Sequence, residues 1–375
     1  MNRTAPACLT LVLTLATAAA VSAAPIRSAE AGRAQLARAA VVGISIDNRR
    51  LPMTAVRAAL MRGARPDTLA QRDAPTRIHH DIAPCPAHYF YVPAPSPPNP
   101  GGTMDEYEQL NCWTVVFIRH IYPKWKPYPA PVDPVPYAVF ADRVHKKIGV
   151  GYQDYYGNAE IATYSANWAI QSLTNQLSGA APLSMAADAA GNTYVAAWPS
   201  NQIAVYAPGG TDPAADIIDI GLTAVYGVAV DKAGDLFASG FNTYGNFEVD
   251  EASAGSNYTF TALPISGQFP GGLAIDSRQN LWVCDQGDGS SGSISKLAPP
   301  YTGRAKVAFS YAGDNFGIAI SSDNKSLIAA NNVFQGSQSY SGAVIYSLPS
   351  GSVQASSPTN PGIMTAATFR DVSSI

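Results

Sequence analysis

The chain has 375 residues, of which 47% are apolar and 14% are charged, and its formal net charge is −3. That length allows two ordinary domains or one large all-β domain, and the apolar fraction is sufficient for a large core. With 31 Gly and 29 Pro, many short elements joined by turns are favoured over long helices.

The balance of charge differs between the two parts of the chain. Residues 1–150 carry 17 Lys and Arg against 10 Asp and Glu, a balance of +7. Residues 151–375 carry 7 against 17, a balance of −10, and the two sum to −3. A nucleic-acid-binding domain would place basic residues on its folded part. Because the second, more regular part is acidic, we expect no nucleic-acid partner.

Residues 1–23 have the features of a secretory signal peptide. Arg3 precedes the apolar run "ACLTLVLTLATAAAV", and Val21-Ser22-Ala23 supplies small residues for cleavage. The run is short and rich in Ala and Thr for a membrane span, and retention as an uncleaved anchor is the alternative. The sequence therefore predicts an exported protein, secreted or periplasmic, with no transmembrane segment in the mature chain.

Two irregular zones follow the signal peptide. Residues 24–80 are rich in Ala and Arg, and we expect them to be disordered or partly helical. Residues 81–136 are rich in Pro and aromatic residues, a composition that opposes central strands and favours an extended, wrapping chain. One strand is predicted in this zone, "NCWTVVFIRHIY" at 111–122.

Three cysteines remain after the signal peptide is removed. Cys85 and Cys112 both lie in the irregular zone, so we expect them to form a disulfide in an oxidising compartment. Cys284 ends an apolar strand, and we predict a buried free thiol there.

An internal repeat occupies residues 137–375. Each copy has a buried strand, a tight turn of Asp or Ser with Gly or Asn, and a second buried strand. Gly227, Gly272, Gly317 and Gly362 are separated by 45 residues each. The copies are "YAVFADRVHKKIGVG" (137–151), "LSMAADAAGNTYVAA" (183–197), "YGVAVDKAGDLFASG" (226–240), "GGLAIDSRQNLWVCD" (271–285), "FGIAISSDNKSLIAA" (316–330) and the truncated "PGIMTAATF" (361–369).

Two further, half-exposed strands are predicted after each hairpin, for example "NQIAVYAPGG" (201–210) and then "DIIDI". Four short antiparallel strands per repeat of this length are typical of a β-propeller blade. The truncated last copy offers one inner strand, "GIMTAAT", whose partners would come from "CWTVVFIRHI" near the N-terminus. The sequence therefore predicts an all-β propeller of six four-stranded blades closed by both ends of the chain. Five blades, or an open solenoid, are the alternatives.

These repeats resemble the six-bladed propellers of the NHL-repeat and senescence-marker/gluconolactonase superfamily. In the lactonase branch, the resemblance implies a divalent metal held by carboxylate and Asn side chains at the top of the inner strands. Here Gly271 stands at the position of the acidic residue and Phe316 at that of the Asn, with Asn315 one residue early. A shift of one residue turns a side chain to the other face of a strand unless the strand bulges. We therefore expect neither a metal nor a cofactor.

The streptogramin-lyase branch of propellers is also similar, and the resemblance implies a channel His for its chemistry. Residues 146–375 contain no His. A His general base would have to come from the earlier part of the chain, at His79, His80, His88, His120 or His145.

Several acidic or metal-binding residue types recur in patterns that favour structural roles. Asp188, Asp231, Asp276 and Asp323 sit in the hairpin turns, where Asp accepts hydrogen bonds from local backbone N–H groups. "HHDIAPCPAH" (79–88) matches no paired-ligand zinc spacing, and "CDQGDGSSGS" (284–293) lacks the terminal Glu of a calcium loop.

The candidate ligand-binding residues lie at the mouth of the propeller: Tyr137, Leu183, Tyr226 and Phe316. The loops around them are rich in Asn, Gln, Ser, Tyr and Gly, which suit hydrogen bonding and aromatic contact with a protein or carbohydrate ligand. No catalytic residue is predicted. The first hypothesis is a monomeric, non-catalytic binding or scaffolding module, and the alternative is a divergent metal-dependent lactonase with a relocated site.

Overall fold

The structure is a computed structural model, and every regular element in the part that it describes is a β-strand. That part contains no helix that could span a membrane. The described residues are 88–94, 103–111, 114–121, 135–142, 144–153, 158–165, 170–174, 180–213, 215–219, 221–288, 291–312, 314–335, 338–357, 360–361 and 367–369.

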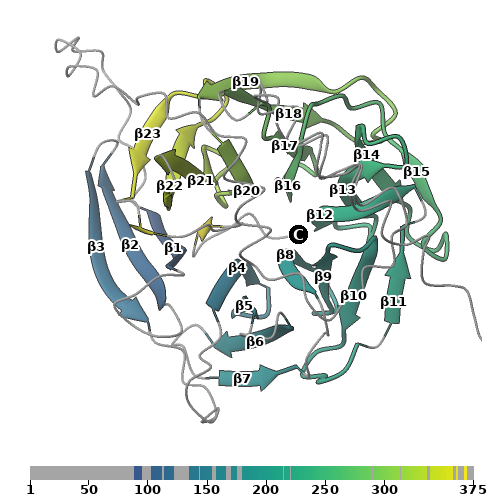
Figure 1. Cartoon of the computed structure of the whole chain (residues 1–375), viewed down its shortest axis with the longest axis horizontal. Coiled ribbons are helices and arrows are strands. Elements are labelled where there is room, and N and C mark those ends of the chain that lie inside the picture. Colours follow the sequence, from purple (N-terminus) through teal and green to yellow (C-terminus); the bar gives the residue numbers. More distant parts are fainter. Residues whose placement is uncertain are drawn as a thin grey trace, which may run out of the picture.

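Five blades are built from consecutive strands, each blade an antiparallel sheet whose first strand is the innermost (Figure 1). Blade 1 consists of β4 (Val135–Asp142), β5 (Lys147–Gln153), β6 (Ala159–Ser165) and β7 (Ile170–Leu173). Blade 2 consists of β8 (Ala181–Ala187), β9 (Thr193–Trp198), β10 (Gln202–Tyr206) and β11 (Ala215–Ile218). Blade 3 consists of β12 (Leu222–Val230), β13 (Leu236–Asn242), β14 (Phe247–Ala252) and β15 (Phe260–Ala262). Blade 4 consists of β16 (Pro270–Ile275), β17 (Leu281–Asp285), β18 (Ser291–Leu297) and β19 (Lys306–Ala312). Blade 5 consists of β20 (Asp314–Ile320), β21 (Ser326–Gln335), β22 (Gln338–Ser347) and β23 (Val353–Ser356), with β24 (Asn360–Pro361) paired to β22.

A further sheet, here called the closing sheet, joins the two ends of the described chain. Its order is β25 (Thr368–Phe369), β1 (His88–Ala94), β2 (Thr103–Asn111) and β3 (Thr114–Ile121). It lies between blade 5 and blade 1 and completes the ring around the central axis (Figure 1). Closure by both ends of the chain was predicted from the truncated last repeat, and this sheet provides it.

Two details of that closure differ from the prediction. The segment "TVVFIRHI" forms β3, the outermost strand, whereas the strand that pairs with β25 is β1. The Pro-rich composition was expected to oppose central strands, yet β1 lies between β25 and β2 and contains Pro93. The described β25 pairs only with Phe90 and Tyr91, so the N–H that Pro93 lacks is not required on that side.

Several predictions fall outside the described residues. These are the signal peptide (1–23), the zone 24–80, the cluster around His79 and the disulfide between Cys85 and Cys112. They remain predictions.

The glycines of the repeat mark where inner strands approach one another at the axis. A Cβ on Gly272 would lie 2.7 Å from the Cα of Gly317, and one on Gly227 would lie 2.6 Å from the carbonyl oxygen of Gly271. Farther from the axis, the blades pack on one another through large apolar side chains such as Ile203, which is fully buried with residues of blade 3. The repeat therefore encodes small residues at the axis and large ones between blades.

Candidate functional site at the propeller mouth

A β-bulge interrupts the inner strand of every one of the five blades at the same place. The pairing between the first and second strands shifts by one residue there, and one or two residues of the inner strand are skipped. Bulges re-aim side chains, which the ladder would otherwise hold to one face or the other. The skipped residues are Tyr137, Leu183, Tyr226, Gly271 with Gly272, and Phe316 with Gly317.

Three of the four predicted mouth residues meet around one small cavity. Leu183, Tyr226 and Phe316 line it with Gly271, Gly272 and Gln286, and its volume is about 10 Å³. The structure does not bring Tyr137 into this lining; that side chain is buried, at 7% exposed. We call these six lining residues the mouth. The cavity is large enough for about one water molecule.

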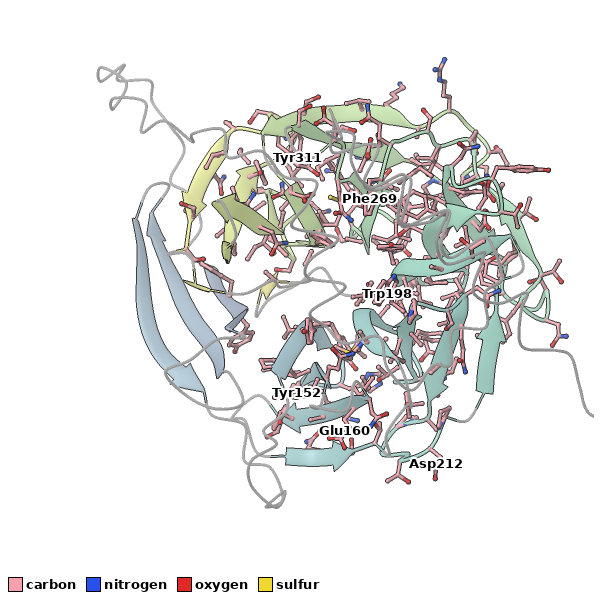
Figure 2. All side chains as sticks on the ribbon, viewed as in Figure 1. Tyr152, Glu160, Trp198, Asp212, Phe269 and Tyr311 are labelled. Atoms are coloured by element: carbon pink, nitrogen blue, oxygen red, sulfur yellow. The ribbon has the colours of Figure 1, made fainter. Side chains whose placement is uncertain are left out.

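Aromatic side chains surround the mouth. Tyr226 packs edge-on against Phe241 and Phe269, with both ring centroids 5.7 Å away, and those two rings are 4.9 Å apart. Figure 2 places Phe269 and the half-buried Trp198 near the centre of the ring. On the same face, the loop after β13 presents Tyr244, which is 87% exposed. This face, here called the mouth face, therefore offers aromatic contact area.

Gln286 is a mouth residue that the sequence analysis missed. Its side chain is fully buried, its Nε2 donates to the carbonyl of Pro270, and its Oε1 has no hydrogen-bond partner in the protein. A buried acceptor without a partner is costly, and the cavity beside it is of the size that one water occupies. Counted from the bulge, the corresponding residues of the other blades are Gln153, Trp198, Phe241 and Asn332. An amide occupies this position in blades 1, 4 and 5 and an aromatic residue in blades 2 and 3, and this pattern on the second strand was the signal that could have identified Gln286.

The central channel continues behind the mouth as a cavity of about 130 Å³. Small and apolar residues of all five inner strands line it, together with Ala367 just before β25. The hydroxyl of Ser184 accepts the N–H of Val228 at 3.2 Å, so this polar group is engaged between blades. The channel wall therefore carries little chemistry along most of its length.

His145 lies at the other end of the channel, in the hairpin turn of blade 1. Its Nδ1 is 2.7 Å from Oδ2 of Asp142, and its backbone N–H donates to Oδ1 of the same carboxylate at 3.0 Å. Of the five His residues considered as general bases, this is the one whose side chain the structure describes, and it is remote from the mouth.

The metal site of the lactonase branch does not fit the residues present. Blade 5 does bulge beside Asn315, as a displaced ligand would require. Its amide is nevertheless used inside the blade: Nδ2 donates to Tyr346 at 2.9 Å, and Oδ1 accepts from Asn331 at 2.8 Å. Gly271 has no side chain to offer. Among the described residues, no group of three or more His, Cys, Asp and Glu is arranged to hold a metal ion.

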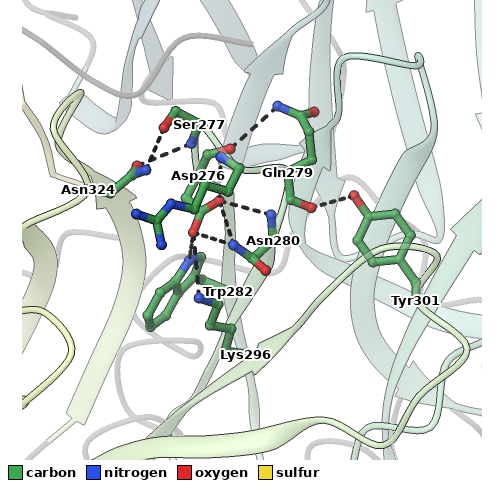
Figure 3. Close-up of polar contacts among 9 residues, drawn as sticks. Asp276, Ser277, Gln279, Asn280, Trp282, Lys296, Tyr301 and Asn324 are labelled. Atoms are coloured by element: carbon green, nitrogen blue, oxygen red, sulfur yellow. Dashed lines mark hydrogen bonds and ion pairs between the residues drawn. The ribbon is translucent and has the colours of Figure 1, made fainter.

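The repeated aspartates organise the hairpin turns on the face opposite the mouth, here called the turn face. Oδ1 of Asp276 accepts the N–H groups of Arg278 and Asn280, both at 2.9 Å, and its Oδ2 accepts the indole N–H of Trp282 at 2.9 Å (Figure 3). Asp188, Asp231 and Asp323 accept backbone N–H groups of their own turns in the same way. The structural role predicted for these residues is confirmed.

The segment that follows β17 is also held by its own hydrogen bonds. Oδ1 of Asp285 accepts three backbone N–H groups, from Gln268, Phe269 and Gly287, at 2.9–3.0 Å. Cys284 is a buried free thiol, as predicted, and burial raises its pKa well above the ordinary value. Neither residue has the character of a reactive group.

An acidic cluster lies where the chain passes from blade 2 to blade 3. Asp219 and Asp250 are at most 2% exposed, and oxygens of both, with Glu248, lie within 3.5 Å of the point where a Cβ on Gly221 would stand. Burial raises the pKa of both aspartates, and the neighbouring carboxylates raise that of Asp250 further, to about 8. The pair therefore favours a protonated carboxyl hydrogen-bonded to a carboxylate.

No family model matches this chain, and no curated protein matches it in sequence. Among solved structures, TolB from Acinetobacter baumannii superimposes with a TM-score of 0.55 at 11% identity, over 76% of this chain and 66% of TolB. The chain thus covers just under two thirds of that protein. A functionally unknown protein from Desulfotomaculum acetoxidans DSM 771 gives a TM-score of 0.48 at 12% identity, over 76% of this chain and 86% of that one. Virginiamycin B lyase from Staphylococcus aureus gives a TM-score of 0.42 at 14% identity, over 60% of this chain and 72% of the lyase.

At these identities the similarity concerns the fold alone. Together with the ring of sheets, it defines the chain as a β-propeller. Membership of the NHL-repeat and gluconolactonase group stays a prediction.

Proposed function

We propose that the protein is an exported, non-catalytic binding module, a propeller in which the closing sheet serves as the sixth blade and the mouth face takes up a protein or glycan ligand. The observation that carries the proposal is the lining of the mouth. It consists of two aromatic rings, one Leu, two Gly and one amide, with no carboxylate, imidazole, amine or thiol. Such a lining offers no group for acid–base or nucleophilic chemistry, and the aromatic mouth face around it supplies contact area for a ligand.

The surroundings of the mouth support the same proposal. Trp198 is half-buried and Tyr244 is exposed on this face. Trp and Tyr are among the residue types that contribute most to binding energy at interfaces. The residues that a metal-dependent lactonase would need are absent from the lining or used within a blade, so nothing favours the alternative.

The test compares two exposed tyrosines of blade 3. Tyr244 lies on the mouth face, and Tyr258, 41% exposed, lies on the turn face. The purified chain and its Tyr244→Ala, Trp198→Ala and Tyr258→Ala variants are used to capture ligands from the extracellular or periplasmic fraction and on a glycan array. We expect Tyr258→Ala to retain the ligand and the other two to bind it about tenfold or more weakly. Equal losses in all three variants, or steady turnover of lactone substrates by the unmodified chain, would refute the proposal.

A further inference from the structure

A groove of about 570 Å³ lies between blades 4 and 5 on the turn face. Blade 4 contributes its first hairpin and parts of β18 and β19, and blade 5 contributes its two turns on this face. None of its lining residues belongs to the mouth. It is therefore a separate concavity, of the size that small-molecule sites have.

Basic side chains gather in this groove although the surrounding chain is acidic. Residues 151–375 hold only seven Lys and Arg against 17 Asp and Glu. Four of those seven line the groove: Arg278, Lys296, Lys306 and Lys325. Two carboxylates also line it, so the groove has an excess of two positive charges within an acidic half. This local reversal of sign attracts anions.

Both carboxylates of the groove are engaged by the turns that hold them. Asp276 is buried and accepts the turn and indole N–H groups described above, and Asp323 accepts from Ser321 and from the backbone of Lys325. Lys296 is placed by its neighbours: its Nζ is 5.0 Å from the centroid of the Trp282 ring and 4.0 Å from Oδ2 of Asp276. Figure 3 shows these three side chains together. Arg278, Lys306 and Lys325 are exposed, so their charges are available to a ligand.

Apolar side chains also line the groove, next to the basic ones. Ala308, Leu348 and Pro349 line it, and Asn324 is held at the rim because its Oδ1 accepts the N–H of Ser277 at 3.2 Å. A ligand that matches this lining carries anionic groups together with an apolar face and hydroxyl groups. A sugar ring has such an apolar face, and a uronate or sulfate group supplies the charge.

We propose that this groove binds an acidic saccharide, with its carboxylate or sulfate groups on the exposed Arg278, Lys306 and Lys325 and a ring face on Leu348 and Pro349. The site goes beyond the function proposed for the mouth and does not depend on it.

Calorimetric titration tests the proposal with two probes, trigalacturonate and a heparin-derived tetrasaccharide, at low and at high salt. Fully methyl-esterified trigalacturonate is the neutral control. The double variant Lys306→Gln/Lys325→Gln removes two exposed charges, and Lys232→Gln removes an exposed lysine of the corresponding turn in blade 3, outside the groove. We expect at least one acidic probe to bind, to weaken with added salt, and to lose roughly fivefold or more in affinity in the double variant alone.

Four outcomes would overturn the proposal, and the first three concern the saccharide probes. They are the absence of binding by both acidic probes, equal affinity for the neutral ester, and an equal loss in Lys232→Gln. Inorganic sulfate that binds as tightly as the saccharides would indicate a simple anion site and would overturn it as well. If the mouth-face variants lose ligand capture while the titrations are unchanged, that loss bears on the function proposed for the mouth and not on the groove.

Discussion

Asp276 shows, at the scale of one residue, why the repeated aspartates belong to the fold. It is 3% exposed, and its two oxygens accept two backbone N–H groups, the Asn280 amide and the Trp282 indole. Removing the carboxylate leaves buried donors without partners, which costs about 1–3 kcal/mol for each such group.

We therefore expect Asp276→Ala to lower the free energy of unfolding by about 3 kcal/mol or more, as measured by urea denaturation. Asp323→Ala is the matched control, because Asp323 occupies the corresponding turn of blade 5 but is exposed. Asp323→Ala should lower the free energy of unfolding by about 1 kcal/mol. Similar losses in the two variants would show that burial of Asp276 is not what makes it important.

The raised pKa of Asp250 makes the stability of the fold depend on pH. Its pKa in the folded protein is raised to about 8, mainly by burial and then by Asp219 and Glu248, whereas an unfolded Asp titrates near pH 4. Between these values the folded state binds more protons than the unfolded state. Stability due to this group is therefore complete below about pH 4 and falls as pH rises to about 8.

We expect the urea midpoint to be lower at about pH 9 than at about pH 5, by the equivalent of roughly 2 kcal/mol. In Asp250→Asn, which cannot ionise, most of this dependence should disappear. Asp212→Asn, at an exposed position on the outer edge of blade 2, should leave it unchanged. An unaltered pH profile in Asp250→Asn would place the titrating group elsewhere.

At the scale of the elements, the hairpin turns share one left-handed backbone position. Lys146, Gly191, Gly234, Gln279 and Asn324 occupy it, with φ between 53° and 89°. Glycine adopts this conformation freely, whereas a residue with a Cβ is strained there.

We predict opposite effects of two substitutions in these turns. Gly234→Ala should destabilise by about 1 kcal/mol through the backbone alone, because the nearest atom to its Cβ would be 3.6 Å away. Lys146→Gly should be neutral or stabilising by up to about 1 kcal/mol, since Lys146 is exposed. Thermal melts would measure both; a stabilising Gly234→Ala would contradict this account of the turns.

The elements differ in how well the sequence predicts them. Hairpins such as β16–β17 were recognisable because apolar strands and an Asp turn recur every 45 residues. The strand β1 was missed, because its pairing with β25 joins residues 90–91 to residues 368–369 and no local pattern records it. Gln286 was missed for a related reason. The bulged residues belong to the first strand of each repeat, where the sequence pattern is regular, whereas Gln286 directly follows the second strand.

At the scale of the whole molecule, the ring depends on the short strand β25. Phe90 and Tyr91 of β1, both buried, pair with Phe369 and Thr368, and Ala367 beside them is 2% exposed in the channel. Without β25 the inner edge of β1 would be open to pairing with another chain.

Removal of residues 367–375 should therefore lower stability by roughly 2 kcal/mol and increase aggregation. Removal of residues 371–375 alone is the control and should change neither. Differential scanning calorimetry with light scattering would test both truncations; an unchanged melting temperature in the longer truncation would show that β25 does not close the ring.

The mouth face, with its bulged inner-strand residues, is the surface on which we propose that this propeller binds its ligand. Hydrogen–deuterium exchange of the free protein and of its complex with the captured ligand would locate the surface that the ligand covers. We expect slower exchange in segments 182–184, 225–227 and 240–246, at the bulges and in the loop that carries Tyr244. Slower exchange confined to the turn-face hairpins 188–192 and 231–235, with the mouth segments unchanged, would contradict it.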